Sequence, residues 1–181
     1  AVADGQFGQD VAIHGDYAVV GTNGSGRAYI FVRGQNNVWS QLSQLVPAID
    51  EPDADLSLFG WTVDIAPRVA VVTDPKNVAD NFMEAAAYVF EPNVNGQWIQ
   101  TGRLTPPIPE VQSFFGRDVA TDGEWIVVSQ DQYTGCIGCP GSRVIDQGRL
   151  NIYRKNPEGD WVHHQSIDGA GYKEQLGVTV K

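Results

Sequence analysis

The sequence predicts an all-β fold built from four-stranded antiparallel units, with three complete units and the first strand of a fourth. Three observations support this prediction. A fifteen-residue phrase recurs, reading FGQDVAIHGDYAVVG from Phe7, FGWTVDIAPRVAVVT from Phe59 and FGRDVATDGEWIVVS from Phe115. The spacing of apolar residues is constant inside this phrase and from the third apolar run to the end of the fourth. The apolar runs are short, rich in β-branched and aromatic residues and separated by turn residues, which is the pattern of strands.

The spacings place each strand in order. The first two strands lie inside the recurring phrase, and the turn between them reads HGD, APR or TDG. The third strand follows as AYIF, AYVF or LNIY, and its last aromatic residue always precedes a tryptophan by 8 residues. That tryptophan opens the fourth strand and precedes an aliphatic residue by 6. We expect the three tryptophans to pack between units, with an exposed row for sugar stacking as the alternative: Trp39, Trp98 and Trp161.

The size of the unit predicts the architecture. Four-stranded meanders that repeat every 52, 56 and 61 residues match the blades of a β-propeller. We therefore expect residues 1–181 to form a single propeller segment, with blades at about 7–45, 59–104 and 115–167 and a fourth beginning at 176–181. A solenoid of three stacked sheets is the alternative.

All variation in length falls in two connections, the one between strands two and three and the one between units. In an up-and-down meander these two connections lie at the same end of the strands, so every variable loop should lie on one face. Insertions confined to one face often mark a binding face. The alternative is that surface loops simply tolerate changes in length.

The repeated phrase resembles the FG-GAP repeat, which builds the seven-bladed propeller of integrin α chains and of many secreted proteins. The Phe-Gly pair, VAIHGDYAVVG, AYIF and WSQLSQL stand where that pattern has its four strands. The resemblance covers about residues 7–181. It implies a propeller fold and an extracellular or cell-surface role in binding or adhesion.

The resemblance does not extend to calcium. Many FG-GAP blades carry an Asp-rich calcium loop after the first strand, but the turns here offer too few closely spaced oxygen atoms for that ion. An acidic stretch between the first two units could hold calcium loosely or be a solvated loop: Asp50, Glu51, Asp53 and Asp55. No cofactor and no metal site are therefore expected.

Two features concern the compartment. Cys136 and Cys139 form a C-x-x-C in the longest variable loop, and we expect a local disulfide there, with free thiols or a metal or redox role as alternatives. A disulfide would indicate an oxidising compartment. Asn23 begins an N-x-S triplet and is a possible glycosylation site.

Catalytic motifs are not evident, so we expect no enzyme. The chain has three histidines and no G-x-S-x-G, H-E-x-x-H or phosphate-binding glycine loop. Asp10 and Asp118 occupy one position of the first strand, where the other units have Thr62 and Thr179. In a closed propeller these four could line the channel as an ion-holding polar ring, or be solvated there.

Charge and hydropathy exclude two classes of partner. With 22 acidic and 12 basic residues the chain has a formal charge of −10, which opposes binding to nucleic acid. It also has no apolar run of 18 residues, so we expect no membrane span.

These observations predict an extracellular or cell-surface scaffold that contacts a protein or glycan through its loop-rich face. The predicted contact residues are polar or aromatic side chains on the long loops: Asp74, Lys76, Asp80, Phe82, Asp131, Tyr133, Arg143 and Asp146. Two other functions stay open, a self-assembling structural module joined through the C-terminal strand and a propeller polysaccharide lyase or hydrolase. Further expected partners are the remaining blades of a longer chain or a second copy of this one.

Overall fold

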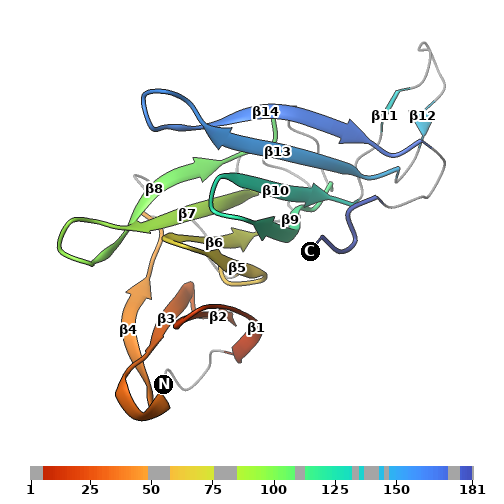
Figure 1. Ribbon diagram of the computed structural model, residues 1–181. Coiled ribbons are helices and arrows are strands. Elements are labelled where there is room, and N and C mark those ends of the chain that lie inside the picture. The colour runs from red at the N-terminus through yellow and green to blue at the C-terminus, as the bar shows by residue number, and fades with distance from the viewer. Residues whose placement is uncertain are drawn as a thin grey trace.

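The computed structural model describes residues 6–48, 58–75, 85–108, 113–131, 135–136, 143–144, 147–170 and 176–180. It contains three four-stranded antiparallel sheets, which confirms the predicted fold class (Figure 1). Among these residues no helix is long and apolar enough to cross a membrane.

Each sheet is one blade. The first blade runs in the order β1 (Gln6–His14), β2 (Tyr17–Asn23), β3 (Arg27–Arg33) and β4 (Trp39–Leu45), with a 3-10 turn, η1 (Gln35–Asn37), before β4. The second has β5 (Val63–Ala66), β6 (Val69–Asp74), β7 (Ala86–Pro92) and β8 (Trp98–Leu104). The third has β9 (Phe115–Thr121), β10 (Trp125–Gln130), β13 (Arg149–Lys155) and β14 (Trp161–Asp168).

The sequence did not predict the small hairpin between β10 and β13. There β11 (Gly135–Cys136) pairs with β12 (Arg143–Val144) as a separate two-stranded sheet. It lies inside the longest variable loop and projects away from the third blade (Figure 1).

The blades fan out from a common inner edge. Strands β1, β5 and β9 lie next to one another at that edge, while β4, β8 and β14 lie on the outside (Figure 1). Each blade therefore has a forward face, toward the next blade in sequence, and a rear face, toward the preceding one.

The core consists of the two interfaces between blades. In the first interface, aliphatic side chains on the forward face of the first blade meet aromatic and aliphatic residues on the rear face of the second. The forward side supplies Val19, Ala28, Ile30 and Leu45, and the rear side includes Phe59, Val63, Ile65, Phe90 and Trp98. The second interface repeats the arrangement, with Val69, Val71, Val89 and Leu104 against Phe115, Val119, Tyr153 and Trp161.

The Phe-Gly pair that begins the recurring phrase packs at the interface between blades. Phe59 is 0% exposed and inserts into the first interface against Tyr88 and Phe90. Gly60 has a φ of +96°, and a Cβ atom there would lie 2.6 Å from the backbone of Thr22 in the preceding blade. The glycine is therefore required both by its conformation and by the close approach of two blades.

Two of the three recurring tryptophans pack between blades, as expected. Trp98 is 8% exposed and contacts Tyr17 of the first blade, with ring centroids 6.1 Å apart. Trp161 is 9% exposed in the second interface. Trp39 is 38% exposed, because no described residue covers the rear face of the first blade.

Residues 176–180 differ from the expected lone strand. They make one isolated bridge, between Leu176 and Gly148, instead of a continuous ladder. They nevertheless occupy the place of a next inner strand. Gly177 has a φ of +92° and packs on Ser129, much as Gly60 packs on the first blade.

Candidate binding site

The strand order places the two variable connections at one end of every blade. We call this the loop end, and the end with the short turns, such as His14–Tyr17, the turn end. At the loop end β2, β6 and β10 finish while β1, β5 and β9 begin. The sequence therefore correctly placed both variable connections on one side of the molecule.

Buried polar side chains gather at the loop end. Burial of polar atoms is costly unless they are hydrogen-bonded, so such a group needs a reason. These residues are 6% exposed or less and lie at or next to the loop-end termini of strands: Thr22, Asp74, Ser113, Gln130, Asp131, Gln147 and Arg149.

Three side chains form a cluster at the inner margin of the loop end. Trp61 and Arg117 each stand two residues after the Phe of their unit, and the Arg117 guanidinium carbon lies 5.8 Å from the Trp61 ring centroid. Arg117 Nε lies 3.9 Å from Asp131 Oδ2, and the Asp131 side chain is only 7% exposed. Trp61 and Arg117 are half-buried. The cluster thus presents an aromatic ring, a guanidinium and a carboxylate together.

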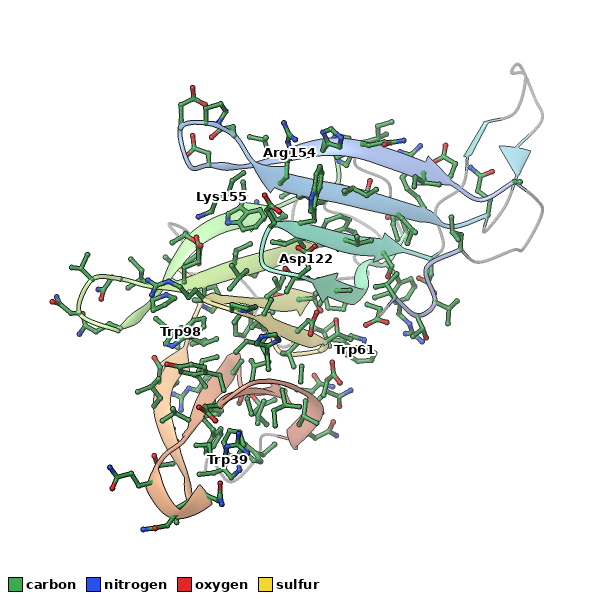
Figure 2. All side chains as sticks on the ribbon, viewed as in Figure 1. Trp39, Trp61, Trp98, Asp122, Arg154 and Lys155 are labelled. Carbon is green, nitrogen blue, oxygen red and sulfur yellow. The ribbon has the colours of Figure 1, made fainter. Side chains whose placement is uncertain are left out.

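Figure 2 shows Trp61 toward the end of the blades where the arrows of β6 and β10 point, whereas Trp98 lies toward the opposite end (Figure 2). The cluster of Trp61, Arg117 and Asp131 joins the start of two inner strands to the end of β10. It therefore lies where loops of two blades converge.

A second polar network supports the loop end of the third blade. Asn151 donates to Gln130 Oε1 at 3.1 Å and accepts from the Ser166 hydroxyl at 2.9 Å. His163 Nε2 lies 2.9 Å from the same hydroxyl. Arg149 donates to Asp168 through Nε and through its terminal nitrogen, the latter at 2.9 Å. These bonds cross neighbouring strands and hold the rear face of the blade in place.

Carboxylates connect the inner strands of successive blades. Asp10 Oδ2 accepts the N–H of Val63 at 2.8 Å, and its other oxygen accepts the N–H of Val11 at 2.9 Å. Asp64 accepts from Thr121 at 2.6 Å and from Ile65 at 2.8 Å. Asp118 repeats the pattern with Val180 at 2.8 Å and Val119 at 2.9 Å. We call each such bridge an aspartate clasp.

The aspartate clasps differ from the polar ring expected from the sequence. Thr62 does not act as the counterpart of Asp10, because its hydroxyl lies 2.8 Å from that of Thr73 inside its own blade. Asp64, two residues further on, takes the role instead. The missed signal was a triplet of Asp, an aliphatic residue and Ala that occurs in all three units: Asp10–Ala12, Asp64–Ala66 and Asp118–Ala120.

The environment of Asp64 affects its titration. Burial raises the pKa of this carboxyl above its usual 3.8, and the charges of Asp10 and Asp118 raise it further, against the lowering effect of the two amide hydrogen bonds. The inner edge is thus an acidic strip whose carboxylates are satisfied by backbone amides. No three His, Cys, Asp or Glu side chains in the described part of the chain are grouped so as to hold a metal ion.

Two of the predicted contact residues lie in the described part with their side chains. Asp74 ends β6 and is 1% exposed, and Asp131 follows β10 and is 5% exposed. Both are buried in the loop end instead of projecting from it. Asn23, the possible glycosylation site, ends β2 at the same end and is half-buried.

The other predicted residues lie wholly or partly outside the described residues. Only the backbone of Arg143 and Cys136 is described. Arg143 in β12 and Cys136 in β11 are paired with each other across the two strands. The remainder lie outside, including the second cysteine of the expected disulfide and the acidic stretch: Lys76, Asp80, Phe82, Tyr133, Cys139, Asp146, Asp50, Glu51, Asp53 and Asp55. Sequence reasoning missed Trp61 and Arg117, although their shared place two residues after the Phe was visible.

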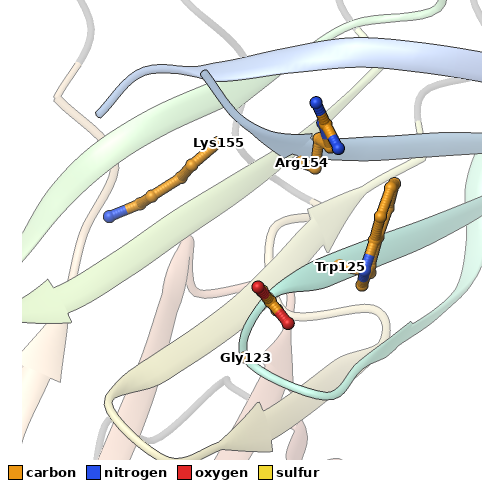
Figure 3. Close-up of a pocket in the computed structure, with 5 residues that line it drawn as sticks. Gly123, Trp125, Arg154 and Lys155 are labelled. Carbon is orange, nitrogen blue, oxygen red and sulfur yellow. The ribbon is translucent and has the colours of Figure 1, made fainter. Parts of the chain in front are cut away.

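A pocket of about 160 Å³ lies at the turn end of the third blade (Figure 3). Its lining includes Trp125, with the Arg154 guanidinium carbon 5.4 Å from the Trp125 ring centroid, and Lys155. Trp125 has the place on the forward face that Tyr17 and Val69 have in the other blades, where each is in or beside an interface. The corresponding space on the first and second blades is where the next blade packs.

The fold resembles that of solved propeller proteins. A periplasmic gluconolactonase from Pseudomonas aeruginosa matches 87% of this chain and 38% of its own, with 17% sequence identity and a TM-score of 0.50. The chain folds as blades of a β-propeller. A hypothetical selenium-binding protein from Sulfolobus tokodaii matches 86% of this chain and 39% of its own, with 10% identity and a TM-score of 0.48. This chain thus spans less than half the length of these two structures.

The identity with the gluconolactonase is low enough that the likeness concerns the fold alone. No protein-family model matches the sequence, and no curated protein matches it. The propeller architecture expected from the repeats is therefore confirmed, while membership of the FG-GAP family is not shown.

Proposed function

We propose that this chain is a propeller segment that binds a glycan at its loop end, with the cluster of Trp61, Arg117 and Asp131 as the point of contact. The observation that carries the proposal is the cluster itself. An aromatic ring, a planar array of N–H donors and a carboxylate acceptor together match a sugar ring with its apolar face and its hydroxyl groups.

The surroundings favour a stable site. Asp131 is buried and Arg117 packs over Trp61, so both polar groups are oriented before a ligand arrives. Side chains that are already ordered lose less conformational entropy when they bind. Buried polar residues of the neighbouring strands, Gln130 and Arg149, support the same end of the blade.

The proposal is tested with a glycan array followed by titration calorimetry on the best binder. Replacing Trp61 by Ala removes the stacking face, and Arg117→Ala removes the donors, so each should weaken binding by about tenfold or more. Matched controls at the turn end of the second blade are Val94→Ala and Arg68→Ala, both at exposed residues. These two variants should bind as the parent does.

If the chain binds no glycan on the array, the glycan proposal is wrong and a protein ligand is favoured. If Trp61→Ala leaves the affinity for the best glycan unchanged, the cluster is not the point of contact. The activity of the gluconolactonase is not transferred to this chain. Self-assembly would use a different surface of the molecule.

We extend the proposal to a location outside the cell. The sequence supports it through the N-x-S triplet at Asn23 and the C-x-x-C of Cys136 and Cys139. Alkylation of the intact protein from its native source, followed by mass spectrometry, tests the idea. A disulfide should leave both thiols unlabelled, whereas two labelled cysteines would remove this support.

A further inference from the structure

Among the described residues, the rear face of the first blade is exposed at positions that are buried in the second blade. Phe7, Val11 and Ile13 are 57%, 63% and 66% exposed. Their counterparts in the second blade are no more than 4% exposed: Phe59, Val63 and Ile65. The same residue types are therefore buried in the second blade, where the first blade packs on them.

The glycine after the Phe gives an independent sign that this face is open. Gly8 has a φ of +88°, close to the +96° of Gly60, yet an added Cβ at Gly8 would meet nothing within 4 Å. At Gly60 it would meet the backbone of the preceding blade. The first blade thus has the conformation that accepts a neighbour, and the described residues supply none.

The hydrogen bonds between inner strands indicate which type of blade fits the rear face of the first blade. In the second and third blades two amides of the inner strand meet aspartates, those of the fourth and sixth residues after the Phe. In the second blade Val63 donates to the preceding blade and Ile65 to its own Asp64. In the third blade the roles are exchanged, because Val119 donates to its own Asp118 and Thr121 to the preceding blade.

The position of the bridging aspartate within the inner strand therefore alternates from one blade to the next. An aspartate three residues after the Phe, as in the first and third blades, clasps the fourth-residue amide of the next blade. An aspartate five residues after the Phe, as in the second, clasps the sixth-residue amide. In the first blade Asp10 already accepts the amide of Val11, the fourth residue. The amide that corresponds to the clasped one in the third blade is that of Ile13.

We propose that the rear face of the first blade docks a preceding propeller blade of the second-blade type, whose aspartate, five residues after its Phe, accepts the Ile13 amide. Its forward face would be lined with small aliphatic side chains, like the faces that cover Phe59 and Phe115. This interface is independent of the glycan site.

A second copy of this chain fits the face poorly. The forward face that it could offer is that of the third blade, whose Asp118 stands at the wrong position and is engaged by Val180. Charge opposes this docking too. Between the second and third blades Glu91 pairs with Lys155 at 2.8 Å, and the corresponding residues of such a contact would be Arg154 and Arg33. Two arginines would replace an ion pair.

The test joins one more blade to the full chain. A copy of residues 59–114, which is the second blade with its following connection, is fused ahead of residue 1. Hydrogen exchange of the Ile13 amide and of the Trp39 indole N–H is then followed by NMR. We expect both to exchange more slowly in the fusion, Ile13 by about tenfold or more.

Two matched fusions separate the clasp from simple coverage. The same added blade with Ala in place of its Asp64, and an added copy of residues 115–175, should both bury Trp39 but leave Ile13 exchanging faster than in the first fusion. Equal protection of Ile13 by all three fusions would overturn the proposal.

The unfused chain provides a measurement that does not depend on the fusion folding. As a monomer it should exchange Ile13 quickly while Ile65 and Val119 exchange slowly. Protection of Ile13 in the monomer would overturn the proposal. So would a head-to-tail oligomer, detected by light scattering, in which Ile13 is protected, because the occupant would then be a second copy.

Discussion

Asp10 and Val63 are 53 residues apart in the chain, yet the carboxylate of the first accepts the backbone N–H of the second at 2.8 Å. This bond connects the inner strands of two blades whose other contacts are largely apolar. It accounts for a charged residue, Asp10, in the middle of β1.

Removing this carboxylate should loosen the first interface. In Asp10→Ala the amides of Val11 and Val63 lose their acceptor, and we expect the free energy of unfolding to fall by about 1–3 kcal/mol. Urea denaturation measures the loss. The control is Asp16→Ala, which breaks an exposed pair with Arg33 and should cost about 1 kcal/mol or less. Equal losses would show that the clasp adds nothing to stability.

The pKa of Asp64 gives a pH-dependent prediction. Because burial, together with Asp10 and Asp118, raises the folded-state pKa above the usual 3.8, the folded chain binds this proton more tightly than the unfolded chain. The contribution of Asp64 to stability is therefore fully present below pH 3.8 and is lost as the pH rises through the folded pKa. The difference in stability between the parent and Asp64→Asn, measured against pH, should show this decline. A difference that grows with pH would contradict it.

Glu91 should have the opposite pH dependence. Burial alone would raise its pKa, but the hydrogen bonds from Lys155 and Thr101 and the Lys155 charge lower it below 4.5 overall. Its stabilising effect is thus present above pH 4.5 and is lost as the pH falls through the lowered folded pKa. Glu91→Gln should remove that loss on acidification, as followed by thermal unfolding. Since Lys155 is 40% exposed, we expect the pair to contribute about 1 kcal/mol or less.

The recurring Phe offers a matched comparison of buried and exposed positions. Phe59→Ala should lower the free energy of unfolding by about 3–5 kcal/mol, because Phe59 is fully buried and its removal leaves a cavity. Phe7→Ala should cost about 1 kcal/mol or less, because Phe7 is 57% exposed. Chemical denaturation of both variants is the measurement. A large effect of Phe7→Ala would mean that something covers the first blade in solution.

The glycines separate backbone strain from steric contact. Gly8→Ala imposes a Cβ on a positive φ with open space around it, whereas Gly60→Ala adds a contact with Thr22 to the same strain. We expect Gly60→Ala to cost about 1–3 kcal/mol more than Gly8→Ala. Thermal unfolding of the two variants gives the difference, and equal costs would show that the blades do not approach as closely as described.

Much of the fold could be predicted from the repeat alone. Constant spacings inside the recurring phrase, and from the third-strand aromatic to Trp39, Trp98 or Trp161, predicted the strand order, and Trp98 and Trp161 pack between blades as expected. The loop end also followed from strand direction, since only two connections vary in length.

The candidate site was harder to predict, for physical reasons. Long variable loops suggested exposed contacts, but Asp74 ends β6, Asp131 directly follows β10, and both are buried. Alignment of the units on the Phe matched Thr62 to Asp10. The residue that bridges to the next blade is Asp64, two residues further along, so this alignment did not reveal it. Trp61 and Arg117 come together only when two blades pack side by side.

The alternation of the clasp restricts how many blades a ring could contain. If a single blade were duplicated, its two copies would direct two carboxylates to the same amide of the inner strand, and the other of the fourth- and sixth-residue amides would have none. Duplicating a pair of blades would preserve the alternation. A closed ring that alternates throughout must therefore have an even number of blades, and an odd ring must break the rule once. The fourth unit, with Thr179 and Lys181 at the two positions that carry aspartate elsewhere, is where this chain breaks it.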